Sequence, residues 1–293
     1  MTSGTSSFDV VLVGAGTVGT AVAHNLRDAG HRVVAVASRS RRSAEIAGDR
    51  LAAPVVEVDA LPAADLVLIG SGDDAIASVA ERISERVRPG AFVCHFAGSL
   101  GTSPLAAITR VGASACAVHP VQALPTFELA VERLPGSAWG VTCSDAETDA
   151  AISLMIRRDL LGTPVSIAEG DRTLWHVAAV MSANGVAALL GVAEEVLKQI
   201  GIEHPESVVG PLAAGAVQNA REAGGGAATL TGPVVRNDVA TIERHLAALE
   251  DSPTYLRDAY LSVMRLVYDV ALHAGRDVGD IGASLEDLVG PWK

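Results

Sequence analysis

Lysine, cysteine and aromatic residues are all scarce in this chain of 293 residues. Aromatic residues make up only 3% of the composition and apolar residues 49%, so we expect a core built mainly from small aliphatic side chains. Lysine occurs only at Lys198 and Lys293, and all other basic residues are arginines. A reaction that depends on a lysine side chain therefore has very few positions to draw on.

Positive charge is also in the minority. The formal net charge of −12 and the isoelectric point near 5.1 argue against nucleic acid and anionic membrane surfaces as partners. The three cysteines, Cys94, Cys116 and Cys143, are widely spaced and form no CxxC pair. The N-terminal "MTSGTSSF" has neither the basic nor the apolar region of a signal peptide. We therefore predict a cytoplasmic protein without a disulfide framework. The eight histidines form no HxH or HxxxH pair, so no metal site is predicted.

The most informative stretch is "DVVLVGAGTVGTAVAHNLRDAGHRVVAVASRSRR", residues 9 to 42. A buried parallel strand, a G-x-G-x-x-G turn, an Ala/Val-rich helix and a second apolar strand follow one another in it. Gly14 permits the tight turn, Gly16 lets a pyrophosphate approach the backbone, and Gly19 lets helix and strand pack closely. Thr17 and Val18 begin the helix, whose free N–H groups attract an anion. Because the glycines lie inside a complete βαβ unit, the pattern predicts a dinucleotide site.

The end of the second strand indicates which dinucleotide binds. NAD sites usually carry a carboxylate there, whereas this chain has Ser38, Arg39 and Ser40, followed by two more arginines. Hydroxyl and guanidinium groups suit a 2′-phosphate, which a carboxylate would repel. We therefore predict NADP(H) as the cofactor. Arg41 and Arg42 are equally well explained as the solvated start of the next helix.

Further strands are expected around residues 65–70, 90–97, 114–121, 138–143 and 163–168, with a helix over 145–162. In open α/β sheets, ligands bind beyond the carboxyl ends of the strands. Four residues lie at such ends and are candidates for cofactor, substrate or proton transfer: Ser71, Gly98, Ser99 and His119. His95 lies inside its strand, so packing is the favoured explanation for it.

From about residue 171 the pattern changes to helices only, which predicts two domains, 1–170 and 171–293. The run "TLWHVAAVMSANGVAALLGVA", residues 173–193, is uncharged and long enough to span a bilayer. Against a membrane span, His176, Ser182 and Asn184 are costly at membrane depth. We instead expect a helix buried on most sides and a homodimer formed through the helical domain.

Two groups of polar residues in this half are candidate site residues. His176 and Asn184 are eight residues apart, so on a regular helix they point within about 80° of each other and face one cleft. A satisfied core or capping histidine remains the alternative for His176. In "LTGPVVRND", residues 230–238, Arg236 suits a substrate carboxylate, with Thr231 and Asp238 beside it. The alternative is that Asp238 or Asn237 simply caps the next helix.

Four motifs carry a resemblance to known families: "HFAGS" at 95–99, "HPVQALP" at 119–125, "WHVAAVMSAN" at 175–184 and "LTGPVVRND" at 230–238. With the glycine turn they resemble a bacterial family of Rossmann-like proteins with a C-terminal domain of unknown function. This family lies within the 6-phosphogluconate dehydrogenase-like superfamily, together with ketopantoate reductase, pyrroline-5-carboxylate reductase and prephenate dehydrogenase. The resemblance implies an α/β fold, with an N-terminal Rossmann domain followed by an all-α domain. It also implies a homodimer.

This chain differs from the related families at the positions of their catalytic residues. β-Hydroxyacid dehydrogenases and ketopantoate reductases use a lysine, with an asparagine four residues later, on the first long helix after the Rossmann domain. This chain has His176 and Asn184 there instead. Prephenate dehydrogenases resemble it in the His-Pro pair at His119, but their "HLPH"-like motif is replaced by "MSAN".

These observations predict an NADP(H)-dependent oxidoreductase for a small carboxylate-bearing oxo or imine substrate, with a ketopantoate-like 2-oxo acid as first choice. His176, or else His119, would exchange the proton, Asn184 would orient the substrate oxygen, and Arg236 would hold the carboxylate. One alternative is a prephenate- or arogenate-type dehydrogenase that uses His119. Another is a regulatory protein that binds NADP(H) without catalysis.

Overall fold

A computed structural model describes residues 7–289 of the chain. Its contacts divide it into two compact units, Met1–Ala183 and Asn184–Lys293. The predicted boundary at residues 170/171 lies earlier, before helix α7 (Arg172–Val180). The difference has a physical cause, because the first turn of α7 packs against the N-terminal sheet through the buried side chain of Arg172.

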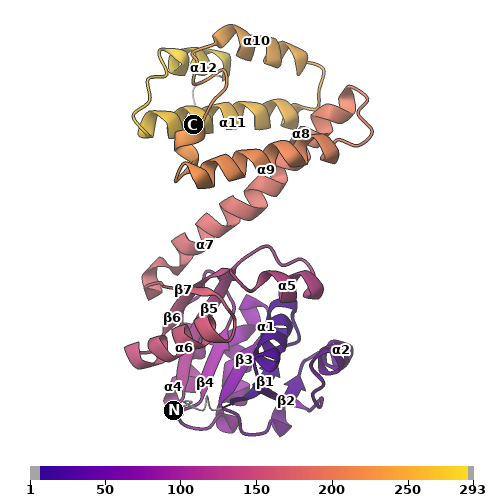
Figure 1. Ribbon diagram of the computed structural model, residues 1–293, viewed down its shortest axis with the longest axis vertical. Coiled ribbons are helices and arrows are strands. Elements are labelled where there is room, and N and C mark those ends of the chain that lie inside the picture. Colours follow the sequence, from indigo (N-terminus) through magenta and orange to yellow (C-terminus); the bar gives the residue numbers. More distant parts are fainter. Residues whose placement is uncertain (1–6, 290–293) are drawn as a thin grey trace. The chain divides into compact units, whose positions relative to one another are not determined.

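The N-terminal unit is built on a seven-stranded sheet of order β2-β1-β3-β4-β5-β6-β7 (Figure 1). Its strands are β1 (Asp9–Val13), β2 (Arg32–Ala37), β3 (Leu66–Ile69), β4 (Phe92–His95), β5 (Ser114–Val121), β6 (Ala138–Cys143) and β7 (Thr163–Ser166). Neighbouring strands are parallel except for the antiparallel pair β5 and β6. The inner strands are continuous apolar runs, as expected for a sheet covered on both faces. The predicted α/β fold with a Rossmann domain is confirmed.

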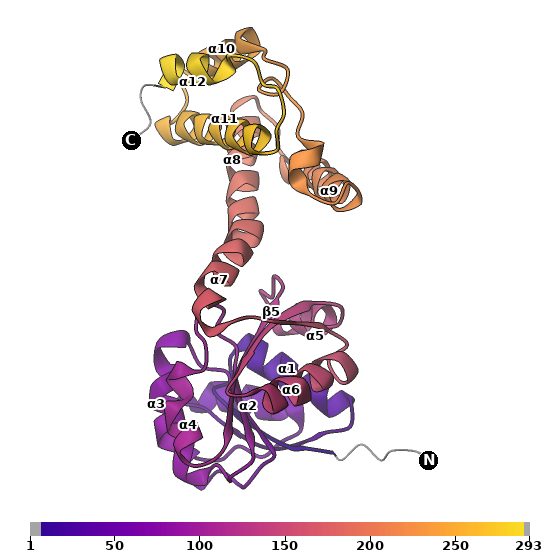
Figure 2. The same cartoon turned by 90° about the vertical axis from the view of Figure 1, so that its left-hand side faces the viewer.

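Helices cover both faces of this sheet (Figure 2). One face packs against α1 (Thr17–Asp28), α2 (Arg41–Leu51), α5 (Phe127–Arg133) and α6 (Ala146–Arg158). The other packs against α3 (Ile76–Ile83) and α4 (Ala106–Arg110). Short 3-10 helices lie at Val58–Ala60, Asp73–Ala75, Ser84–Arg86, Ser103–Leu105 and Glu169–Asp171. Because both faces are covered, only the ends of the strands are free to bind a ligand.

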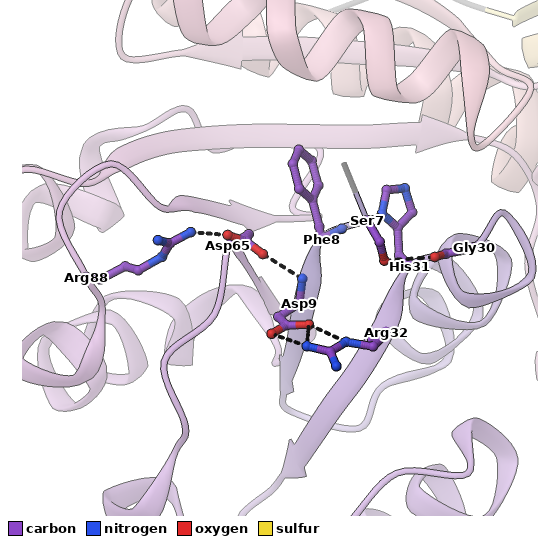
Figure 3. A network of polar contacts seen from close by, with 8 residues as sticks. All are labelled: Ser7, Phe8, Asp9, Gly30, His31, Arg32, Asp65 and Arg88. Atoms are coloured by element: carbon purple, nitrogen blue, oxygen red, sulfur yellow. Dashed lines mark hydrogen bonds and ion pairs between the residues drawn. The ribbon is translucent and has the colours of Figure 1, made fainter. Parts of the chain in front are cut away.

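A polar network joins the amino ends of three strands (Figure 3). The Arg32 guanidinium donates two hydrogen bonds, of 2.8 and 2.7 Å, to the Asp9 carboxylate. The Asp9 backbone N–H donates to Asp65 at 2.7 Å, and Asp65 also binds Arg88. These contacts tie β1, β2 and the segment before β3 together at the end of the sheet that carries no candidate site residue.

The three cysteines, distant in sequence, lie in one row across the sheet. Cys94 on β4 pairs with Cys116 on β5, which in turn pairs with Cys143 on β6. All three are free thiols. Hydrogen bonds to Cys143 and Cys94, together with burial, raise the pKa of the Cys116 thiol well above its ordinary value. Neutral thiols packed in this way act as small apolar core residues.

The C-terminal unit is helical, as predicted. It contains α8 (Val186–Gln199), α9 (Glu206–Glu222), α10 (Val239–Ala248), α11 (Thr254–His273) and α12 (Ile281–Val289), with a 3-10 helix at Gly226–Thr229. Its small core is centred on buried Val234, Ile242, Leu261 and Ile281. A π-helical turn, Met181–Gly185, connects α7 to α8, and the boundary between the two units lies inside it.

The continuous helix Glu169–Gln199 is long and apolar enough to cross a membrane by length and composition alone. None of its most apolar window is buried within the chain. Within the single chain this helix is not buried on most sides, so the expected burial depends on the homodimer, which stays a prediction. The packing of the first helical turn argues against a membrane span, because buried Arg172 anchors that turn to the sheet.

Candidate functional site

The glycine turn after β1 is shaped by close backbone approach. Gly14 has φ +88°, in the left-handed region that favours glycine, and a Cβ on it would lie 2.6 Å from the Ser71 backbone nitrogen. A Cβ on Gly16 would lie 2.5 Å from the Gly70 carbonyl oxygen, and one on Gly19 would lie 2.9 Å from the Gly70 Cα. The ends of β1 and β3 thus meet without side chains between them. Gly70, which the sequence analysis did not single out, is as necessary to this contact as the three motif glycines.

The first turn of α1 is open to an anion. Its N-cap is Gly16, which supplies no side-chain hydrogen bond, and its first turn contains no acidic residue. The N–H groups of Thr17 and Val18 are therefore not capped by a side chain, as the motif predicts.

A cavity of about 620 Å³ lies beside this turn, at the carboxyl ends of β1, β2 and β3. It is lined by Gly14, Gly16, Ser38, Arg39, Ser40, Gly70, Ser71, Asp74, Val79 and Arg82, among others. The Ser71 hydroxyl oxygen is buried and has no hydrogen-bond partner among the residues that the structure describes. A buried hydroxyl without a partner is costly, and a bound ligand would remove that cost.

The three arginines after β2 differ in their surroundings. Arg39 lines the cavity and forms no hydrogen bond or ion pair within residues 7–289. Arg41 instead binds Glu45 at 2.8 Å and lies 3.8 Å from Glu57, and these contacts raise its pKa. Arg42 is exposed and lies outside the cavity lining. Of the three, Arg39 is the guanidinium available to a bound phosphate.

Ser40 has a structural task in addition to its place in the cavity lining. Its hydroxyl accepts a hydrogen bond of 3.2 Å from the Ser43 backbone N–H and caps helix α2.

Arg82, which the sequence analysis did not consider, brings a second guanidinium to the cavity. The Asp59 carboxylate accepts two hydrogen bonds from it, of 3.1 and 2.9 Å.

A second cluster forms at the carboxyl ends of β4 and β5 and the amino end of the antiparallel β6, where the first turn of α7 meets the sheet. Arg172, Trp175 and His176 are three and four residues apart, so they share one face of the helix. Arg172 is only 1% exposed. Its guanidinium donates to the backbone carbonyls of Ala97 at 2.6 Å, Leu100 at 3.0 Å and Gly140 at 3.0 Å. Burial lowers the pKa of Arg172, and the Glu169 carboxylate nearby raises it in part.

His119, at the end of β5, contacts this turn directly. The Trp175 indole N–H donates to the His119 Nδ1 at 3.2 Å. Gly140, the residue paired with His119 on β6, leaves room for the indole, because a Cβ there would lie 2.6 Å from the Trp175 Nε1. Burial, the charge of Arg172 and the proximity of His176 lower the pKa of His119 to about 4. His119 is therefore neutral near pH 7.

His176 lies beside His119, with ring centroids 5.5 Å apart and planes at 83°. Its Nδ1 is buried and has no hydrogen-bond partner among the described residues. A Cβ on Gly98 would lie 2.3 Å from this nitrogen, so the loop after β4 must be glycine there for the ring to fit. The structure thus places Gly98, predicted as a cofactor contact, against His176. Ser99 follows in the same loop and is half-buried.

His95 has the packing role predicted for it. It is completely buried, its Nδ1 accepts from the Ala97 backbone N–H at 3.2 Å, and its Nε2 donates to the Gly101 carbonyl at 2.7 Å. Burial lowers the pKa of His95, so it is a neutral brace for the loop that carries Gly98.

The candidate residues of the C-terminal unit are more exposed. Asp238 caps α10, accepting from the Thr241 backbone N–H at 3.1 Å and from its hydroxyl at 2.7 Å. These contacts lower the pKa of Asp238 and account for the residue as a helix cap, one of the two predicted explanations. Thr231, Arg236 and Asn184 are exposed. The angle between His176 and Asn184 expected for a regular helix no longer applies, since the π-helical turn lies between them.

Sequence reasoning missed Arg172, Trp175 and Gly140. The spacing R-x-x-W-H was a usable signal, because a basic and an aromatic residue at i, i+3 on an otherwise uncharged helix share a face with His176. Gly140 had no signal, since its importance depends on the cross-strand pairing with His119. Within residues 7–289, no group of three or more His, Cys, Asp or Glu side chains could hold a metal ion.

Several solved structures match the chain over nine-tenths or more of its length, including the following three. A candidate NADP oxidoreductase from Bacteroides fragilis is 26% identical, with a TM-score of 0.76, and the match covers 90% of this chain and 98% of that one. A reductive aminase from Aspergillus terreus, solved with NADPH and ethyl-5-oxohexanoate, is 19% identical, with a TM-score of 0.66 and coverage of 97% and 99%. A third, pyrroline-5-carboxylate reductase from Streptococcus pyogenes, is 15% identical, with a TM-score of 0.58 and coverage of 90% and 99%. The chain thus shares its fold with these three proteins.

Family models agree with this result. Residues 4–120 match a Rossmann-like domain, and residues 137–266 match a domain of unknown function, DUF2520. No curated protein matches the sequence. The resemblance inferred from the motifs is confirmed, since a Rossmann-like model matches the N-terminal part of the chain and the DUF2520 model matches the C-terminal part.

Proposed function

We propose that the protein is an NADP(H)-dependent oxidoreductase that acts on a small carboxylate-bearing oxo or imine compound. The observation that carries the proposal is the pairing of two features at one edge of the sheet, where the parallel strands β1 to β5 end. The glycine-lined cavity with Arg39 lies at the carboxyl ends of β1 to β3, and the histidine pair lies at the carboxyl ends of β4 and β5, beside the amino end of the antiparallel β6. Hydride transfer requires a nucleotide site beside a side chain that can exchange a proton.

The residues around the cavity fit NADP(H). The uncapped first turn of α1 suits the pyrophosphate, and the unpartnered Ser71 hydroxyl supplies a hydrogen bond to the ligand. Arg39, which forms no ion pair with any carboxylate of residues 7–289, suits the 2′-phosphate. When bound, the nicotinamide supplies or accepts the hydride.

The chain's own residues have separate tasks in this proposal. In the reducing direction the hydride adds to the carbonyl or imine carbon, and the π-electron pair moves to the oxygen or nitrogen. His176 gives that atom a proton, and His119 lies beside it to orient the substrate. Asn184 and Arg236 are proposed to orient the substrate oxygen and hold the carboxylate, as predicted from the sequence. A ketopantoate-like 2-oxo acid is the first substrate to test, by analogy with the superfamily.

Two further properties belong to the same proposal. A homodimer formed through the helical unit would cover the apolar side chains that are exposed on α7, α8 and α9. The absence of a disulfide among the three free cysteines is compatible with the predicted cytoplasmic location.

The cofactor assignment is tested by titrating the protein with NADPH and NADH and following nicotinamide fluorescence. NADPH should bind more tightly, and Arg39→Ala should weaken it by roughly tenfold or more, because one charged contact to the 2′-phosphate is lost. NADH binding should be unaffected by this change. Arg42→Ala is the matched control, since Arg42 is exposed near the same helix end and lies outside the cavity. Equal affinity of the wild type for NADPH and NADH would refute the assignment.

Catalysis is tested by NADPH oxidation against a panel of 2-oxo acids and cyclic imines. Turnover of one of them, reduced at least 100-fold by His176→Ala, is the expected result. NADPH binding without turnover on any member would instead support a regulatory protein that binds the nucleotide.

A further inference from the structure

His119 and His176, which lie where the first turn of α7 meets the sheet, differ in their hydrogen bonds. The His119 Nδ1 receives the Trp175 indole N–H at 3.2 Å, whereas the His176 Nδ1 has no partner in the part of the chain that the structure describes. The rings are near neighbours, with centroids 5.5 Å apart. Their surroundings therefore favour two different chemical roles.

The Trp175 contact fixes the protonation of His119 by geometry alone. An indole N–H is a donor and never an acceptor, so the His119 Nδ1 must present its lone pair. Neutral His119 consequently carries its proton on Nε2. A second proton would have to enter at Nδ1, where it would meet the indole N–H and break the hydrogen bond. His119 therefore cannot take up a second proton without losing its hydrogen bond from the Trp175 indole N–H.

The charged groups around His119 act in the same direction. From α7 it faces the buried guanidinium of Arg172 and the ring of His176, and from β6 it faces Gly140, which does not titrate. No carboxylate of the described residues hydrogen-bonds to Arg172, whose N–H groups are directed at backbone carbonyls. The nearby Glu169 carboxylate is itself bound to Thr102 and Ser103. The Arg172 charge is thus only partly offset and opposes a positive charge on His119.

We propose that Trp175 and Arg172 are positioning residues that hold His119 as a neutral hydrogen-bond donor through its Nε2–H. His176 then remains as the histidine that exchanges the proton. The catalytic roles of the two histidines rest on the proposed oxidoreductase function. The tautomer of His119 follows from the Trp175 hydrogen bond and does not depend on that function. A neutral imidazole N–H can polarise a carbonyl, and it stabilises negative charge that develops on the oxygen when hydride reaches the carbon.

The test is nuclear magnetic resonance of the full chain with ¹⁵N-labelled histidine, which distinguishes the two neutral tautomers by their ring-nitrogen shifts. The His119 signals are assigned by their loss in His119→Gln. We expect the Nε2–H tautomer alone at pH 7 and a titration midpoint near 4. An Nδ1–H tautomer, or a midpoint near the ordinary 6.5, would overturn the proposal.

Two variants test the role of Trp175. Trp175→Phe removes the indole donor and keeps an aromatic ring, so both tautomers should become populated and the midpoint should rise by about one pH unit. Gly140→Ala, whose new methyl group would crowd the Trp175 Nε1, should have the same effect without altering Trp175 itself. Leu174→Ala is the control, because its side chain is 71% exposed and should leave His119 unchanged. An unaltered tautomer in both variants would remove Trp175 from the proposal.

The experiment separates this inference from the proposed function, since neither cofactor nor substrate is needed. A single Nε2–H tautomer in a protein that binds no NADPH would leave the tautomer standing and refute the oxidoreductase. Once a turned-over substrate is known, Trp175→Phe should lower kcat and change its pH dependence between pH 5 and 7. A purely structural role would not alter the pH dependence.

Discussion

At the scale of single residues, the chemistry of this protein depends on which side chains are held neutral. Burial, Arg172 and His176 lower the pKa of His119 to about 4, below the value near 6.5 of an unfolded chain. Between these two values the unfolded state binds a proton that the folded state excludes. The free energy of unfolding should therefore fall as the pH is lowered from about 6.5 towards 4.

This pH dependence is measured by urea unfolding at pH 7.5, 6 and 5. His119→Gln should lose less stability than the wild type over this range, because one of the groups that take up a proton on unfolding has been removed. His204→Gln serves as the control, since its side chain is 79% exposed. If the free energy of unfolding changed equally with pH in the wild type and in His119→Gln, the lowered pKa of His119 would be contradicted.

The sequence predicted the residue types of the site better than their contacts. The G-x-G-x-x-G motif and Arg39 could be recognised because they are local, and their backbone environment follows from a single βαβ unit. The buried position of Arg172 could not be recognised in this way, because arginine is seldom fully buried and its partners come from loops and strands far apart in sequence.

At the scale of helices, an experiment can distinguish the two explanations predicted for Asp238, a helix cap and a substrate-binding residue. As an N-cap it accepts two hydrogen bonds from Thr241, and a cap of this kind contributes about 1 kcal/mol. Asp238→Ala should therefore lower the free energy of unfolding by about that amount, measured by urea titration. Asp238→Asn should restore most of it, because asparagine caps equally well, and both variants should bind NADPH like the wild type. A loss of substrate affinity in Asp238→Asn at unchanged stability would instead favour the substrate role.

At the same scale, apolar periodicity predicts the strands and helices of the N-terminal unit but not the π-helical turn before α8. Strands and helices of the N-terminal unit were recognisable, because continuous apolar runs separated by glycine and polar turns are typical of a covered parallel sheet. The uncharged run at residues 173–193 predicts one regular helix, whereas the structure contains the π-helical turn Met181–Gly185 within it. An extra residue in a helical turn leaves the apolar pattern nearly unchanged, so periodicity could not reveal it.

At the scale of the whole molecule, the helices carry exposed apolar side chains, which we propose are covered by a partner. On α9, Val208 and Leu212 are four residues apart and are 49% and 76% exposed, and Leu189 on α8 is 45% exposed. Apolar surface of this kind on consecutive helices is typical of an obligate interface. A second copy of the chain is the partner we expect, and sedimentation or light scattering of the wild type should give a dimer.

Leu212→Arg tests this expectation most directly, because the Leu212 side chain makes little contact within its own chain. A guanidinium at that point would be buried without a partner in the dimer, so the variant should dissociate to monomers at micromolar concentration. Leu154→Arg is the matched control: Leu154 is 57% exposed on α6 of the N-terminal unit, outside the helical unit, and should leave the dimer intact. Because the histidine cluster lies entirely within Met1–Ala183, monomeric Leu212→Arg should keep the His119 tautomer of the wild type. A wild type that is monomeric at these concentrations would show that the apolar helices do not associate as proposed.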